Sequence, residues 1–193
     1  MVTAQDTRQA ILDAALVAFG EKGFGATTIG DVRARSGTST GSIYHWFGSK
    51  EGIAGALYVE GLREYQTGVT AILERERDAE LGVRALLEHH VLWVRDNPDL
   101  ARFLLSRREI ELLPESEEEL ADMNRELFAL TSKWFRAKPA LVDLPPDVLH
   151  AALLGPAQEW SRHWLGGRAR SGVARTAALL GDLAWKALRK DDS

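Results

Sequence analysis

The sequence predicts an all-α protein of about nine helices, and two observations carry this prediction. Apolar residues recur every three or four positions through most of the 193 residues, which is the spacing of one face of an α-helix. Glycines, prolines and capping residues separate these stretches, and no stretch shows the polar and apolar alternation of a strand. Hydrophobic residues make up 45% of the chain, enough to build a packed core.

The first 50 residues predict three helices. A helix from about Asp6 or Thr7 to Lys22 carries apolar rows at helical spacing, and Gly23 ends it. Two short helices joined by a tight turn follow. Thr28 is a suitable N-cap for the first of them, and the acidic residue three positions later completes a capping box.

The second short helix has the composition of a helix that lies in a DNA major groove. Gly37 ends the first short helix in a left-handed conformation, Ser39 caps the second, and the second continues to Phe47. Ile43 and Phe47 are four positions apart and are expected to face inward. Hydroxyl and phenol groups reach phosphates or base edges, and a glycine lets the helix approach closely. The outward residues are Thr40, Gly41, Ser42, Tyr44 and His45.

A long helix is expected from Ser49 to about Glu76, with Lys50 in its first turn. A cation there opposes the helix dipole, whose N-terminal end is positive. A DNA phosphate would explain the lysine, and a solvated surface lysine is the alternative.

Five motifs occur in order between about Thr7 and Leu57: Ala14-Ala15-Leu16-Val17-Ala18-Phe19, Lys22-Gly23-Phe24, Thr27-Thr28-Ile29, Ser39-Thr40-Gly41-Ser42-Ile43-Tyr44 and Phe47-Gly48-Ser49-Lys50-Glu51-Gly52. With these motifs the segment resembles the DNA-binding domain of the TetR/AcrR family of transcriptional regulators. Three positions depart from the usual pattern, because Arg33 and Ser36 replace alanine and Trp46 stands where histidine or tyrosine is common.

The resemblance implies a helix-turn-helix DNA-binding domain over residues 1–50 and a helical ligand-binding and dimerisation domain over residues 51–193. It implies a regulator, most often a repressor, that a small-molecule effector releases from a palindromic double-stranded operator. Movement of the long helix would re-space the two DNA-reading heads of a dimer. The candidate DNA-binding residues are Thr28, Arg33, Ser39, Thr40, Gly41, Ser42, Tyr44, His45 and Lys50.

Five further helices are expected after the long one. Asn97-Pro98 ends one helix and starts the next, and Ser116 begins a capping box for the helix that follows. Gly155-Pro156 predicts a kink inside the eighth helix. The expected segments are about 80–96, 98–113, 116–138, 147–166 and 171–190.

The last two helices, about 147–166 and 171–190, carry more apolar residues than one buried face needs. Small residues such as Ala152, Ala177 and Gly181 allow close contact between helices. The resemblance implies a homodimer through a four-helix bundle of these helices, and packing inside the monomer is the alternative. In such a dimer, recognition helices about 34–36 Å apart read two half-sites one turn apart.

Polar residues on apolar helix faces, and aromatic residues able to line a cavity, are the candidates for a small-molecule site. Glu159 and His163 are four positions apart and can meet on one helix face. The alternatives are hydrogen-bonded core histidines and tryptophans of the core or of the dimer interface. The ligand-binding candidates are His90, Trp93, Asn124, Phe128, Trp134, Glu159, Trp160 and His163.

The net charge of −4 is unusual for a protein that binds nucleic acid. Residues 1–50 hold five basic and four acidic residues, and the remainder holds 19 basic and 24 acidic ones. The acidity therefore belongs to the C-terminal part. DNA binding requires the basic groups of the N-terminal part to gather on one face, and it should be sensitive to salt.

The chain contains no cysteine, which excludes disulfides and thiolate metal sites. We find no signal peptide and no apolar run near the roughly 20 residues that span a bilayer. We therefore expect a cytoplasmic protein without a membrane partner.

The residues are compatible with three classes of function to different degrees. The first is the ligand-responsive regulator. The second is an enzyme using Glu159 with His163, or His89 with His90, but no phosphate loop or nucleophile elbow occurs, so we expect no enzyme, cofactor or metal. The third is a helical small-molecule-binding protein whose helix-turn-helix no longer reads DNA.

Overall fold

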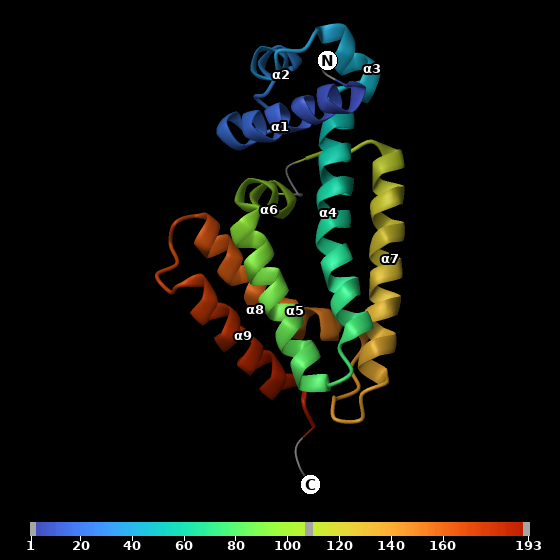
Figure 1. The fold of residues 1–193 in the computed structure, drawn as a ribbon, viewed down its shortest axis with the longest axis vertical. Helices are drawn as coiled ribbons and strands as arrows, with labels where there is room; N and C mark the ends of the chain where they lie inside the picture. The colour runs from blue at the N-terminus through green and yellow to red at the C-terminus, as the bar shows by residue number, and fades with distance from the viewer. Residues whose placement is uncertain (1–2, 107–109, 191–193) are drawn as a thin grey trace. The chain divides into compact units, whose positions relative to one another are not determined.

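The computed structural model describes residues 3–106 and 110–190, whose path Figure 1 shows. These residues form nine α-helices, and their one β-type pairing is an isolated antiparallel bridge between Leu141 and Arg189. The prediction of an all-α protein with about nine helices is confirmed. The helices are α1 (Ala4–Lys22), α2 (Ile29–Ser36), α3 (Thr40–Phe47), α4 (Lys50–Arg75), α5 (Ala79–Asp96), α6 (Pro98–Leu105), α7 (Pro114–Arg136), α8 (Pro146–Leu165) and α9 (Val173–Leu188).

The helices belong to two compact units, each built from two stretches of the chain. The first combines Met1–Arg63 with Asp99–Asp122, and the second combines Glu64–Pro98 with Met123–Ser193. Helices α4 and α7 therefore each contribute one end to each unit. The predicted boundary between a DNA-binding domain (residues 1–50) and a ligand-binding and dimerisation domain (residues 51–193) is a functional division, and it stays a prediction.

The N-terminal part of the first unit is a three-helix arrangement of α1, α2 and α3. Helix α1 buries Ile11 and Ala15 completely, while Val32 of α2 and Ile43 of α3 are also fully buried. Each of these three helices contacts the other two. Because α2 and α3 have only eight residues each, their stability comes from this packing rather than from helix propensity.

Capping residues set where the N-terminal helices begin. In α2, the Asp31 amide donates to Thr28 Oγ1 at 3.2 Å and the Thr28 amide donates to Asp31 Oδ2 at 2.9 Å, as predicted. Thr3 and Asp6 form a second capping box, so α1 begins at Ala4, earlier than expected. Gly37 has φ +67° and ends α2 in the left-handed region, also as predicted.

The core of the second unit is built by α5, α8 and α9 together with the C-terminal ends of α4 and α7, and α9 lies alongside α5 (Figure 1). Val83, Leu87 and Val91 of α5 are almost fully buried there. Trp134 of α7 packs so closely on α5 that a Cβ at Gly82 would lie 2.4 Å from its Cζ2. Gly82 is therefore the residue that this contact requires.

Two further helix starts, those of α7 and α9, differ from the prediction. Helix α7 begins at Pro114 rather than after Ser116, because the Leu113 carbonyl already accepts the amide of Glu117 at 3.1 Å. Helix α9 begins after Gly172 rather than at Ser171, whose Oγ instead accepts hydrogen bonds from Trp160 and Thr176.

Helix α8 continues through Pro156, so the predicted kink there stays a prediction. In the part of the chain that the structure describes, no helix combines the length and the apolar character needed to cross a membrane.

We predict that Gly82→Ala lowers the free energy of unfolding by about 1–3 kcal/mol, because the new methyl group overlaps Trp134. Gly20→Ala is the matched control, since a Cβ at this helical glycine of α1 meets nothing within 4 Å. The control should leave stability unchanged or raise it by up to about 1 kcal/mol. Urea unfolding of both variants at one protein concentration is the measurement, and equal stability would contradict the Trp134 contact.

Candidate nucleic-acid interface and ligand site

The residues predicted to contact DNA come from the cap and body of α2, from α3 and from the first turn of α4, and all nine are at least partly accessible. In α3, Ile43 is fully buried and Phe47 is 9% exposed, whereas Tyr44 is 51% exposed. The predicted division of α3 into an inward and an outward face is therefore confirmed by burial. Contact of the outward face with DNA stays a prediction.

The first turn of α3 presents small polar groups on an open face. The Ser42 amide donates to Ser39 Oγ at 3.0 Å, and the hydroxyl oxygens of these two serines lie 2.9 Å apart. A Cβ at Gly41 would meet only Ser39 Oγ, at an ordinary 3.7 Å. Packing within the described residues thus gives no reason for a glycine there, which fits close approach of a partner to this turn.

Thr28 is committed to the cap of α2. Its hydroxyl donates to Asp31 Oδ2 at 2.8 Å and accepts from the Asp31 amide at 3.2 Å. A threonine hydroxyl has one proton, so donation to a phosphate would require Thr28 to release Asp31. The structure therefore gives Thr28 a capping role first, and its DNA contact stays a prediction.

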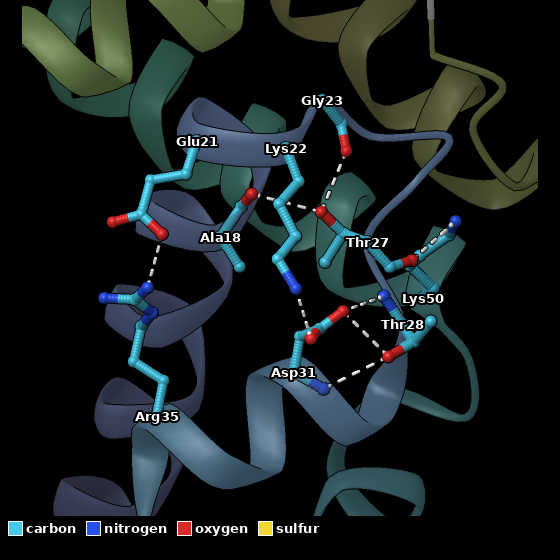
Figure 2. Close-up of polar contacts among 9 residues, drawn as sticks. All are labelled: Ala18, Glu21, Lys22, Gly23, Thr27, Thr28, Asp31, Arg35 and Lys50. Carbon is cyan, nitrogen blue, oxygen red and sulfur yellow. Dashed lines mark hydrogen bonds and ion pairs between the residues drawn. The ribbon is translucent and has the colours of Figure 1, made fainter.

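Ion pairs connect α1 to α2, as Figure 2 shows. Lys22 Nζ lies 2.6 Å from Asp31 Oδ1, and Arg35 pairs with Glu21 at 2.5 Å. The hydrogen bond from Lys22 and those from Thr28 lower the pKa of Asp31 to about 2. Both members of the Arg35 pair are more than 40% exposed, so that pair contributes little to stability.

Arg33 lies on the exposed part of α2, and among the described residues its guanidinium makes no hydrogen bond or ion pair. It is therefore available to a phosphate. His45 is also exposed, while the neighbouring Trp46 is half-buried and lies edge-on to it with ring centroids 5.8 Å apart.

Lys50 has a role inside the fold that the sequence reasoning missed. Its Nζ donates to the carbonyl oxygens of Phe24 at 2.9 Å and Thr27 at 3.0 Å, with a third, longer contact of 3.4 Å to Gly25. The ammonium also lies 4.4 Å from the centre of the Phe24 ring. Loop carbonyls therefore give this cation partners within the fold, and a phosphate contact by Lys50 stays a prediction.

Thr27 is a second residue that the sequence reasoning did not single out. Its side chain is 1% exposed, and its Oγ1 lies 2.8 Å from the Gly23 carbonyl and 3.1 Å from the Ala18 carbonyl (Figure 2). A hydroxyl residue directly before an N-cap was the available signal. Thr27 fixes the loop before α2 to the end of α1.

Among the ligand candidates, His90 and Trp134 are buried. His90 Nδ1 lies 3.0 Å from the Tyr65 hydroxyl, and its Nε2 lies 3.4 Å from Ser161 Oγ. Burial lowers the pKa of His90 to about 4, so the imidazole is neutral at pH 7. Trp134 donates to the Glu76 carbonyl at 3.0 Å, which fits the alternative of a core tryptophan.

Of the other six ligand candidates, Trp93 shares a neighbour with His90, because its ring lies edge-on to the Tyr65 ring with centroids 5.3 Å apart. Glu159 and His163 pair at 3.1 Å, as their spacing predicted, and both side chains are about half exposed or more on α8, whereas His90 is buried. Phe128 is 40% exposed and lies edge-on to His150. The remaining contacts are Trp93 to Glu64, Gln66 to Asn124, and Trp160 to Ser171. The structure does not gather the eight candidates, and ligand binding by them stays a prediction.

Comparison with known proteins identifies the N-terminal helices. A family model described as "Bacterial regulatory proteins, tetR family" matches residues 11–57. An HTH-type transcriptional repressor of Mycobacterium tuberculosis strain H37Rv is 36% identical over 85 residues, which are 44% of this chain and 43% of that protein. An HTH-type transcriptional regulator of Mycobacterium bovis matches to the same extent. The chain thus matches less than half the length of these relatives.

Solved structures share the fold along nearly the whole chain. A bacterial regulatory protein in the tetR family from Rhodococcus RHA1 has a TM-score of 0.81 and 23% identity, covering 96% of this chain and 98% of that one. The transcriptional regulator FadR from Bacillus subtilis, in complex with stearoyl-CoA, has a TM-score of 0.75 and 15% identity, covering 91% and 96%. At these identities the likeness shows the fold.

We predict that Lys22→Met raises the pKa of Asp31 from about 2 toward its ordinary 3.8, because the Lys22 hydrogen bond is the largest cause of the lowering. In the wild type this stabilisation is complete above pH 3.8 and is lost as the pH falls toward 2, since the folded pKa lies below the unfolded one.

An NMR titration of the Asp31 carboxyl carbon measures the shift directly. Arg35→Met removes a neighbouring cation whose partner is Glu21 and should leave the Asp31 midpoint in place. An unchanged midpoint in Lys22→Met would contradict the assigned pair.

Proposed function

We propose that this chain, which belongs to the TetR family of bacterial regulatory proteins, is a DNA-binding transcriptional repressor that reads a palindromic operator as a homodimer and leaves it when a small molecule binds. The observation that carries the proposal is the match of residues 11–57 to the family, over a helix pair whose second helix directs polar groups outward. We propose the cytoplasm as its location, where bacterial DNA lies.

In this proposal α3 enters the major groove and α2 contacts a phosphate. The outward groups of α3 suit the major groove, where hydroxyls and a phenol hydrogen-bond base edges or phosphates. Arg33 on α2 suits a phosphate, because its guanidinium is exposed and without a protein partner among the described residues. Residues 1–50 would form the reading domain, and residues 51–193 would bind the effector and the second copy. The proposed α3 contacts are Ser39, Thr40, Gly41, Ser42, Tyr44 and His45.

The exposed apolar residues of α8 and α9 support a homodimer. Val148 is 45% exposed, Leu179 is 49% exposed and Leu183 is 59% exposed, so each leaves apolar surface in water. Gly155 of α8 has open space where a side chain would be, which permits close approach of another helix. A two-fold dimer would cover the same patch on both subunits.

The second unit supports an effector site through its buried polar groups. Tyr65, His90 and Ser161 form a hydrogen-bonded cluster in an otherwise apolar core. The ligand class is open to experiment, and acyl-CoA compounds are a reasonable first screen, because the FadR structure of Bacillus subtilis holds stearoyl-CoA. A change in thermal stability on adding each compound is the readout.

Selection of DNA from random duplexes tests the proposed function. The purified protein should enrich a palindrome whose half-sites are spaced by about one helical turn. The competing function is a helical small-molecule-binding protein that no longer reads DNA, which the net charge of −4 favours. Absence of any enriched sequence at low salt would support that function and overturn the repressor.

We predict that Leu183→Glu converts the dimer into a monomer, because a charge on the shared apolar patch would be buried without a partner. Leu81→Glu is the matched control, since Leu81 on α5 is equally exposed at 58% but lies outside α8 and α9. Sedimentation velocity measures the mass of both variants. A dimeric Leu183→Glu protein would place the dimer contact elsewhere.

We predict opposite signatures for a phosphate contact and a base contact. Arg33→Ala should weaken binding to all sequences alike and reduce the salt slope by about 1, because one phosphate contact is lost. Thr40→Ala should instead change which sequence is preferred and leave the slope unchanged. Binding titrations at several salt concentrations, on matched and mutated operators, separate a phosphate contact from a base contact. A changed sequence preference in Arg33→Ala together with a reduced salt slope in Thr40→Ala would reverse the two assignments.

A further inference from the structure

We infer that Lys50 is a positioning residue that ties the first turn of α4 to the loop of residues 24–27 and thereby fixes the N-terminus of α2 for DNA reading. The inference rests on the proposed function, because it concerns how the same helix pair is held. It assigns to Lys50 a different role from the phosphate contact that the sequence suggests.

The contacts of Lys50 use the whole ammonium group. A lysine has three protons to donate and no acceptor, and the carbonyl oxygens of Phe24, Gly25 and Thr27 lie 2.9, 3.4 and 3.0 Å from its Nζ. The face of the Phe24 ring adds a cation–π contact at 4.4 Å. A phosphate would therefore have to displace a carbonyl before it could accept from Lys50.

The loop before α2 is held from two sides. Thr27 Oγ1 fixes it to the end of α1 through the carbonyls of Ala18 and Gly23 (Figure 2). Lys50 fixes it to α4 through part-buried hydrogen bonds to the carbonyls of Phe24 and Thr27. Removing either contact leaves the loop attached on one side.

The position of this loop sets the position of α2. Thr28 follows Thr27 directly and is the N-cap of α2, so the carbonyl that Lys50 binds belongs to the peptide unit that leads into the cap. Helix α2 packs in turn on α3. A shift of the first turn of α4 would therefore draw the N-terminus of α2 with it.

A substitution that keeps the charge separates positioning from phosphate binding. Three carbonyls that converge on one point suit a compact ammonium group, whereas the guanidinium of arginine is larger and has its donors in a fixed planar fork. A phosphate accepts an arginine at least as well as a lysine. Lys50→Arg therefore fails in a positioning role and is tolerated in a phosphate role.

The experiment measures Lys50→Arg and Lys50→Met in the full chain, with Lys133→Arg as the control that makes the same substitution at an exposed lysine of α7. Amide hydrogen exchange without DNA follows the loop and the first turn of α2, with α5 as an internal reference for global folding. Titrations with the operator selected by the wild type, at several salt concentrations, give the affinity and the salt slope. Lys50→Met is read in the same way if Lys50→Arg does not fold.

We expect Lys50→Arg to bind the operator about tenfold or more weakly with an unchanged salt slope, which is the scale of a lost charge-assisted hydrogen bond. Exchange should rise by a similar factor in the loop and α2 but not in α5, and Lys133→Arg should change neither the operator affinity nor the exchange. Binding by Lys50→Arg within about threefold of the wild type, or unchanged exchange in α2, would overturn the inference.

The two proposals fail in different ways. If the wild type selects no operator, the proposed function fails, and hydrogen exchange alone still decides whether Lys50 holds α2. If the wild type and Lys50→Arg bind the operator equally well, the proposed repressor function is retained and the positioning role of Lys50 is refuted.

Discussion

The candidate DNA interface depends on the packing of two very short helices against α1. Helices α2 and α3 have eight residues each, too few to remain helical in isolation. Val32 and Ile43 anchor them, since both side chains are fully buried beside the apolar face of α1. Because these anchors fix the rotation of each helix, they also decide which residues face outward. Caps and ion pairs then refine an orientation that packing has already set.

A second constraint acts on α8 and α9, whose apolar residues cannot all be covered within one chain. One face of α9 packs on α5, where Ala177 and Leu188 are buried. Leu179 and Leu183 lie on another face and remain about half exposed or more. The proposed dimer gives these leucines a partner surface.

Features of the fold that depend on local sequence were predictable, and features that depend on distant contacts were not. The caps at Thr28 and Ser39 join residues three positions apart, so spacing alone reveals them. The acceptors of Lys50 lie 23 to 26 residues away along the chain, beyond any local pattern. Helical periodicity likewise locates an apolar face without saying whether the same chain or a second copy covers it. For the same reason, periodicity could not show whether the ligand candidates, which lie on different helices, meet in one site.

The central claim is that α3 lies in the major groove of an operator read by two copies of this chain. Methylation protection of a bound operator tests it most directly, because guanine N7 lies in the major groove. The account predicts two protected clusters of guanines on one face of the duplex, about 10 base pairs apart from centre to centre. A single protected cluster, or a bound complex that leaves guanine N7 fully reactive, would contradict it.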